Sequence, residues 1–289
     1  MGMPRQIARL LLHEHRHRPI AGDILMLGRQ TVYLAPPAAV QLVKDVLGAV
    51  RPGAEPEVDP FTTIGKERGT VSDRGFFGLF SEGKVVALDV SDYEGAEIVH
   101  DMTAPLPAAL EGRFDFIYNG SCLDNMFDPA LALKNMSRLL RPGGRVVHLE
   151  HGSLWPGAYL MYSMDWFYDY YVINDWADCK AYLALWDDVQ GPWDLYGWQP
   201  VMQVKDHGVF YGESLVTTPR HAYAIVLAEK GEASTWEKAP LQSKYRPPAV
   251  RNDYFAGAKR FLLSPRKYVH TGTVTPPALP NAVFCGSLP

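Results

Sequence analysis

Short apolar runs that alternate with helix-like segments are the feature that most constrains this 289-residue chain. The run DILMLG begins at Asp23, and similar runs begin at Lys84, Ala96, Arg113 and Gly144. Nearly all-apolar runs of this length are typical of strands buried on both faces of a parallel sheet. Strands that alternate with helices predict an α/β fold with a doubly wound, mostly parallel sheet.

Two later runs, AYLALWD at 181–187 and HAYAIVLAEK at 221–230, bring the predicted sheet to seven strands. After residue 230 the chain is rich in proline and polar residues and has little periodicity. We therefore predict an α/β domain at 1–230 and a C-terminal arm at 231–289. The arm would cover the domain, form a dimer contact or be partly disordered.

Composition excludes several classes of function. The net charge of −4 gives no general attraction to nucleic acid. Three widely spaced cysteines form neither a disulfide framework nor a zinc motif, and the histidines of HEHRHR at 13–18 would diverge on a helix, so no metal is expected. The chain shows no secretory signal and no run of about 18 apolar residues. We expect a soluble, cytoplasmic protein without a nucleic-acid or membrane partner; a homo-oligomer stays open.

In a doubly wound sheet, ligands bind at the carboxyl ends of the strands. Asp89 follows the second run, where its carboxylate can accept both hydroxyls of a ribose. Asp101 follows the third run and can accept from an adenine amino group, while Met102 covers the ring face. Either acid alone is equally consistent with a turn or cap residue, but the two together favour an adenosine ligand.

The segment FDFIYNGSCLDNMFDPALALKNMSRLLRPGGRVV, at 114–147, carries a resemblance to a known family. Its opening Phe-Asp, its LDN turn, its FDP helix start and its LRPGG helix end resemble the fourth-strand to fifth-strand unit of class I S-adenosylmethionine-dependent methyltransferases. The resemblance extends over about 20–230 and is specific for about 84–150. It implies a Rossmann-like methyltransferase fold and S-adenosylmethionine as the cofactor.

The resemblance also implies roles for individual residues. Asp89 would bind the ribose, and Asp101 and Met102 would face the adenine. The residues from Asn119 to Ser121 would lie along the methionine part of the cofactor.

Two departures from the family pattern are visible. Gly28 is followed by Arg29 and Gln30 instead of further glycines, and the family's EH turn is Asp124 and Asn125 here. The backbone can still approach a ligand at Gly28. Arg29 could pair with the carboxylate of the cofactor, and Gln30 could hydrogen-bond the same end. Alternatively, the two long side chains fill the pocket and leave a catalytically inactive protein.

The segment 151–200 holds six of the seven tryptophans, mixed with several aspartates. Aromatic faces stack on planar rings and on sugar faces, so this segment suits a cover over a polar ring substrate. Candidate substrate contacts are Trp155, Tyr159, Trp166 and Tyr170. A helix core or a dimer face is the alternative for any one of them.

Methyl transfer to an oxygen usually needs a general base. His151 follows the fifth strand, and the ordinary histidine pKa of about 6.5 suits this role. The alternative for His151 is a turn histidine bonded to backbone. Asp124 and Glu150 are reserve candidates, and His148 is less attractive because it lies within the strand.

These observations favour an S-adenosylmethionine-dependent methyltransferase that modifies an oxygen or nitrogen of a small polar, sugar-like molecule. The alternative is a catalytically inactive protein of the same fold that serves as a binding or assembly subunit. A nicotinamide-dependent dehydrogenase fits less well, because no G-x-G-x-x-G motif follows the first strand.

Overall fold

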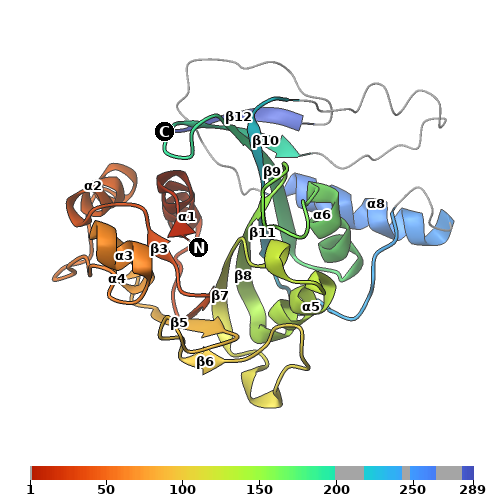
Figure 1. Ribbon diagram of the computed structural model, residues 1–289. Coiled ribbons are helices and arrows are strands. Elements are labelled where there is room, and N and C mark those ends of the chain that lie inside the picture. Colours follow the sequence, from red (N-terminus) through yellow and green to blue (C-terminus); the bar gives the residue numbers. More distant parts are fainter. Residues whose placement is uncertain (1, 199–217, 243–247, 265–281) are drawn as a thin grey trace. The chain divides into compact units, whose positions relative to one another are not determined.

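The computed structural model describes residues 2–198, 218–242, 248–264 and 282–289. Within these ranges the chain forms two compact units, Met1–Val146 and Val147–Pro289 (Figure 1). Residues 199–200 of the predicted aromatic cover, and 243–247 and 265–281 of the predicted arm, lie outside the described residues.

The first unit is built on parallel strands in the order β7-β2-β5-β6. Their bounds are Asp23–Leu27 for β2, Lys84–Asp89 for β5, Ile98–Val99 for β6 and Phe114–Gly120 for β7. Leu25 of β2 lies between Val86 and Ile117 of its neighbours, and all three are buried. The sheet therefore buries the apolar runs that the sequence identifies, although β6 is only two residues long.

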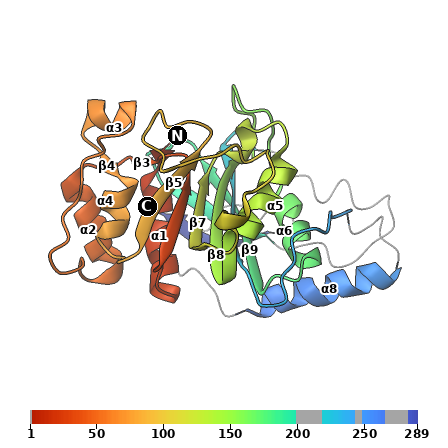
Figure 2. The ribbon, with the colours of Figure 1, turned by 90° about the horizontal axis from the view of Figure 1, so that it is seen from below.

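Helices join these strands, and two of them begin at a side chain that accepts a backbone N–H of the first turn. Ser72 accepts a hydrogen bond from the backbone N–H of Gly75 (2.9 Å), and Asp128 accepts one from Leu131 (3.2 Å). Figure 2 shows these helices beside the strands of the first unit. The bounds are Arg5–His17 for α1, Pro36–Leu47 for α2, Thr63–Arg68 for α3, Asp73–Gly78 for α4 and Pro129–Leu139 for α5.

A small sheet in the order β1-β3-β4 holds the chain just after β2. Its strands are Gly2–Met3 (β1), Thr31–Val32 (β3) and Val71–Ser72 (β4). Because β3 begins at Thr31, the segment 28–30 is held between two strands. Ser72 of β4 is also the cap of α4, so the same sheet fixes where that helix starts.

Strand β8 (Leu140–His151) carries the chain from the first unit into the second. The strands of the second unit run antiparallel in the order β11-β9-β10-β12. Its elements are α6 (Met164–Ile173), β9 (Asp178–Trp186), β10 (Trp193–Trp198), β11 (His221–Glu229), α8 (Pro248–Leu263) and β12 (Ala282–Leu288).

The α/β fold is confirmed, and all seven predicted strands are present. Strands β10 and β12 come in addition. Strand β12 belongs to the predicted arm, yet it pairs with β10 along its whole length, from Trp193 opposite Leu288 to Trp198 opposite Ala282. Helix α8 of the arm packs on α6, where the Tyr168 hydroxyl donates to the carbonyl of Ala258 (3.2 Å). The described parts of the arm are therefore built into the second unit.

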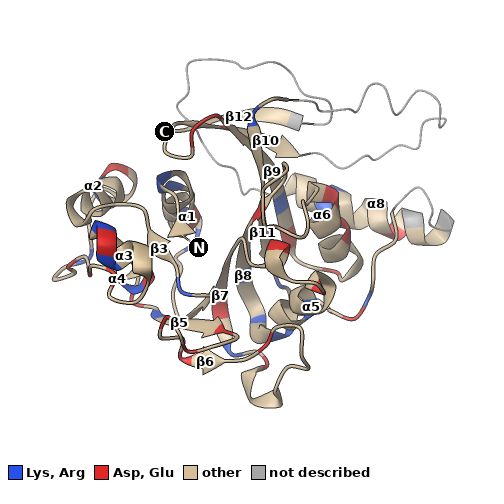
Figure 3. Cartoon of the chain, in the orientation of Figure 1, with Lys and Arg blue, Asp and Glu red and all other residues tan. Residues whose placement is uncertain are grey.

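Charged residues of both signs are interspersed over the described elements (Figure 3). Helix α3 shows this in one turn, with Glu67 between Lys66 and Arg68. Among the described residues, no helix is long and apolar enough to cross a membrane.

Candidate functional site

A cavity of about 320 Å³ lies within the first unit, at the carboxyl ends of its parallel strands. Each strand contributes residues that the sequence singles out: Gly28 and Gln30 after β2, Asp89 at the end of β5, Asp101 and Met102 after β6, and Ser121 after β7. Parallel strands end at the same edge of a sheet, which explains how residues far apart in the sequence meet here.

Gly28 brings the backbone to the cavity. Its φ of +65° is in the left-handed region that favours glycine. A Cβ added here would lie 3.4 Å from Oδ2 of Asp89, so a larger side chain would crowd that carboxylate. The N–H of Gly28 donates to the carbonyl of Leu88 (2.8 Å), which ties the loop to the end of β5.

Three carboxylates line the cavity, and the two at strand ends, Asp89 and Asp101, lie in different settings. Oδ1 of the half-buried Asp89 accepts the N–H of Val90 (2.6 Å), while Oδ2 lies beside Gly28. Asp101 is exposed, and its Oδ1 accepts both the N–H (2.8 Å) and the hydroxyl (2.7 Å) of Thr103. These bonds lower the pKa of Asp101, so it is ionised at neutral pH. Asp101 thus makes a turn, as the alternative in the sequence suggested, and also lines the cavity.

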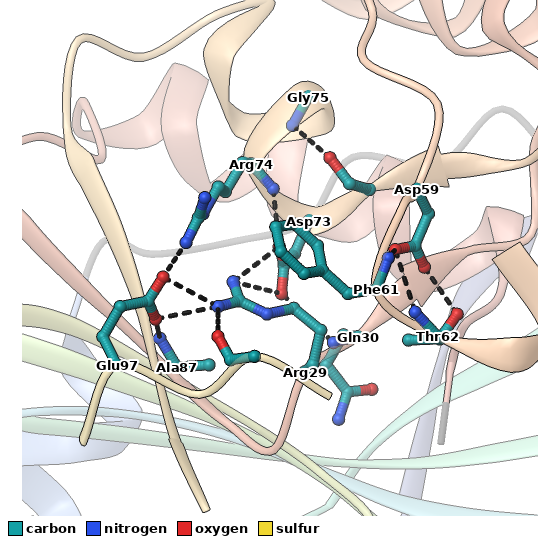
Figure 4. Close-up of polar contacts among 12 residues, drawn as sticks. Arg29, Gln30, Asp59, Phe61, Thr62, Asp73, Arg74, Gly75, Ala87 and Glu97 are labelled. Atoms are coloured by element: carbon teal, nitrogen blue, oxygen red, sulfur yellow. Dashed lines mark hydrogen bonds and ion pairs between the residues drawn. The ribbon is translucent and has the colours of Figure 1, made fainter. Parts of the chain in front are cut away.

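The guanidinium of Arg29 is surrounded by protein acceptors (Figure 4). Nη1 lies 3.2 Å from Asp73, and both side chains are fully buried. Nη2 donates to Glu97 (2.8 Å) and to the carbonyl of Gly95 (2.8 Å). The ring of Phe61 lies 4.7 Å from the guanidinium carbon, a cation–π arrangement.

This network connects the loop after β2 to α4 and to the segment before β6. Asp73 also accepts the N–H of Gln30 (3.1 Å), and Glu97 accepts the N–H of Ala87 in β5 (2.7 Å). Glu97 pairs with Arg74 of α4 as well. The two acids therefore bind both the side chain of Arg29 and the backbone around it, which fixes the cavity wall.

Gln30 presents an amide oxygen without a partner. Its side chain is buried, and Nε2 donates to the carbonyl of Leu27 (3.1 Å), which fixes the orientation of the amide. Oε1 is buried and has no hydrogen-bond partner within the described structure. A buried acceptor left unpaired costs about 1–3 kcal/mol, so it points to a donor that a ligand supplies.

The end of β7 holds Asn119, and the turn that follows it holds Ser121 and Asp124. Asn119 is fully buried and accepts the N–H of Cys122 (3.3 Å). Ser121 has a φ of +59°, a strained conformation for a residue with a side chain, and its hydroxyl donates to Asp124. Asp124 is fully buried and also accepts from Asn125 (2.8 Å). These bonds shape the turn so that Ser121 lines the cavity.

The other predicted site residues belong to the second unit. His151 is buried and stacks on Trp155, with ring centroids 4.8 Å apart and 16° between the planes. Tyr159 is 65% exposed. Trp166 is the third residue of α6, and its ring packs edge-on against that of Phe167.

Tyr170 lies in the same helix, where it is buried and donates its hydroxyl to the carbonyl of Trp236 (3.1 Å). The structure thus brings His151 and Trp155 together, whereas Tyr170 has a core environment.

Several residues that line the cavity are not among the predicted site residues, including Glu94, His100 and Cys122. Nε2 of His100 is buried and has no hydrogen-bond partner within the described residues. The signal was present, since His100 directly precedes Asp101 at a strand end. Among the described residues, no cluster of three histidines, cysteines or acids could hold a metal ion.

A family model described as "Methyltransferase domain" matches residues 78–148. Among curated proteins, the demethylmenaquinone methyltransferase of Staphylococcus aureus (strain MRSA252) is 35% identical over 82 residues, which cover 24% of this chain and 34% of the relative. The chain thus spans about a third of the length of the curated relative that it matches.

Solved structures of low identity resemble the chain. Phosphoethanolamine N-methyltransferase 2 of Haemonchus contortus is 12% identical with a TM-score of 0.41, over 80% of this chain and 54% of the other. The 1,6-didemethyltoxoflavin-N1-methyltransferase of Burkholderia thailandensis is 15% identical with a TM-score of 0.29, over 79% of this chain and 78% of the other.

Parallel strands with acids at their carboxyl ends, around one cavity, are typical of α/β domains that bind a nucleotide-like cofactor. The family match covers α4's end, β5, β6, β7 and α5, and therefore most of the strands that form this cavity. Residues 78–148 thus match the methyltransferase-domain family, in the segment where the sequence resembles class I S-adenosylmethionine-dependent methyltransferases. The resemblance seen in the sequence is thereby confirmed.

Proposed function

We propose that the protein is an S-adenosylmethionine-dependent methyltransferase that transfers a methyl group to an oxygen or nitrogen of a small molecule. The observation that carries this proposal is the cavity of the first unit. It combines a left-handed glycine, two carboxylates at neighbouring strand ends and a buried, unpaired amide oxygen.

The residues at the cavity suit the three parts of the cofactor. Asp89 would accept the ribose hydroxyls through Oδ2, since its Oδ1 already accepts from the backbone. Asp101 and the buried Met102 would contact the adenine, the acid at its amino group and the thioether at its face. Ser121 and the buried Asn119 would shape the methionine end.

The sequence leaves open whether Arg29 and Gln30 bind the cofactor or fill its pocket, and we propose a different role for each residue. The unpaired Oε1 of Gln30 would accept a hydrogen from the ammonium group of the cofactor. Arg29 would not contact the cofactor through its terminal amino groups, because Nη1 and Nη2 are bound to Asp73, Glu97 and a backbone carbonyl. It would instead hold Gln30 in position through Asp73, which binds both residues.

When bound, S-adenosylmethionine supplies an electrophilic methyl group, so the protein mainly has to orient the acceptor and exclude water. His151 is our candidate for the group that takes the proton of the acceptor. Its ring is held against Trp155, which would fix the direction of the proton transfer. Asp124 is a weaker candidate, since its carboxylate is fully buried and binds Ser121 and Asn125.

Calorimetric titration with S-adenosylhomocysteine tests the cofactor site. Replacing Asp89 by alanine removes its charged hydrogen bonds to the ribose; one such bond is worth about 1.5–3 kcal/mol, so affinity should fall at least about tenfold. Asp92→Ala is the matched control, because Asp92 is exposed and does not line the cavity. Equal affinities of the two variants would refute the ribose assignment. Wild-type protein that shows no binding at millimolar S-adenosylhomocysteine would refute the enzyme proposal and favour the inactive subunit.

A second assay concerns the proton acceptor. His151→Ala should lower the turnover number for methyl transfer while leaving the affinity for S-adenosylhomocysteine unchanged. Parallel losses of both would show that His151 has a structural role.

A further inference from the structure

A second cavity, of about 500 Å³, lies entirely within the second unit. Its wall is formed by the residues just after β8, by the segment that leads into α6, and by strands β9, β10 and β11. Its volume is in the range of about 300–1,000 Å³ that is usual for small-molecule sites. No role in the proposed cofactor site uses these residues.

The floor of this cavity is apolar. Leu183 and Leu185 alternate along β9, so they share one face of the sheet, and Ala222 of β11 pairs with Leu185. Met161 and Met164, on either side of the start of α6, complete the apolar wall. Methionine adapts to irregular apolar surfaces and makes favourable contacts with aromatic rings.

Aromatic side chains and one arginine form the remaining wall, and their polar atoms are bound to protein groups. The indole N–H of Trp198 donates to Asp165 (2.9 Å). Arg220 pairs with Asp194 (2.7 Å) and with Asp187 (3.0 Å). The cavity therefore presents aromatic faces without an uncompensated positive charge.

The aspartates that suggested a polar, sugar-like acceptor also have protein partners. Asp165 accepts from Trp198, as described above, Asp175 pairs with Lys238 (2.8 Å), and Asp178 lies 3.4 Å from Lys180. The described residues that line the cavity include the hydroxyls of Ser153, Ser163 and Thr218. The Ser153 hydroxyl accepts the N–H of Ala222 (2.9 Å), so its own hydrogen can be donated to a ligand.

We propose that this cavity is a ligand site of the second unit and that it binds a neutral, largely apolar ring compound bearing one hydroxyl or amine. The proposal goes beyond the proposed methyltransferase function and does not depend on it. Burial of the ring against Leu183, Leu185 and the methionines would supply most of the affinity. The single polar group would be oriented by Ser153.

Titration calorimetry with 2-naphthol, a neutral fused ring with one hydroxyl, tests the proposal directly. Methyl α-glucoside serves as the polar probe. Met161→Trp places a bulky ring in the cavity and should weaken 2-naphthol binding about tenfold or more. Leu160→Trp is the matched control, because Leu160 is the neighbouring residue, is 41% exposed and does not line the cavity. The control should bind within about twofold of wild type.

Binding of methyl α-glucoside with no binding of 2-naphthol would overturn the proposal, as would equal effects of the two tryptophan variants. S-adenosylhomocysteine is titrated into the same proteins. If it binds and 2-naphthol does not, the pocket assignment fails while the methyltransferase proposal stands. If 2-naphthol binds in a manner sensitive to Met161→Trp and S-adenosylhomocysteine does not, the apolar site is supported and the methyltransferase proposal fails.

Discussion

Replacing Arg29 by methionine separates support of the cavity wall from cofactor binding. The side chains of Arg29 and Asp73 are both 0% exposed and lie 3.2 Å apart. Removing one partner of such a buried pair costs about 3–5 kcal/mol, because the other charge stays buried alone. Glu97 adds less than about 1 kcal/mol, since its side chain is 33% exposed and water screens the charge. We therefore expect Arg29→Met to lower the free energy of unfolding by about 3–5 kcal/mol.

Urea unfolding followed by circular dichroism measures this loss. The double variant Arg29→Met/Asp73→Asn leaves no isolated charge at this position, so it should recover most of the lost stability. Arg29→Lys keeps the charge but lacks the planar fork that reaches both acids. Its free energy of unfolding should therefore lie between those of Arg29→Met and the double variant. Suppose instead that Arg29→Met unfolds at the wild-type midpoint and binds S-adenosylhomocysteine about tenfold more weakly. That result would refute the ion-pair role and make Arg29 a cofactor ligand.

Three further predictions concern other parts of the chain. Gly28→Ala should lower the free energy of unfolding by about 1–2 kcal/mol in urea unfolding, because its φ of +65° is in the left-handed region; an unchanged midpoint would show that a Cβ adds no strain at this position. Burial lowers the pKa of His148 to about 3, so the unfolded chain takes up the proton first as the pH falls below 6.5, and stability drops by up to about 1.4 kcal/mol per pH unit. Between pH 7 and pH 5, the free energy of unfolding in urea should fall less for His148→Phe than for wild type. Equal losses in the two proteins would show that His148 does not cause the pH dependence. Deleting 282–289 removes β12 and uncovers the fully buried Trp193. The melting temperature should therefore fall, and dye binding to exposed apolar surface should rise. An unchanged melting temperature would show that β12 adds no stability.

Local signals carried most of the sequence prediction for the first unit. The caps Ser72 and Asp128 and the apolar runs act within a few residues, so their structural effect is readable from the chain. The acids at the ends of β5 and β6 were also identified, because the end of a strand is itself a local feature. Their roles toward the cofactor stay predictions.

The role of Arg29 was beyond local reasoning. Its partners are 44 and 68 positions away, at Asp73 and Glu97, and nothing in the adjacent residues indicates them. Strand β12 was missed for a related reason. Its partner β10 lies about ninety residues earlier, and a proline-rich segment gives no alternation from which to predict the pairing.

The pairing of β10 with β12 bears on the order in which the chain folds during synthesis. Residues 1–146, with the whole set of parallel strands around the first cavity, leave the ribosome well before Ala282 does. At about 5–20 residues per second, the delay is on the order of 10 s. The first unit therefore has time to fold before the second can complete its sheet. Until β12 arrives, β10 exposes an unpaired strand edge, which makes this interval the one in which the nascent chain most needs a chaperone.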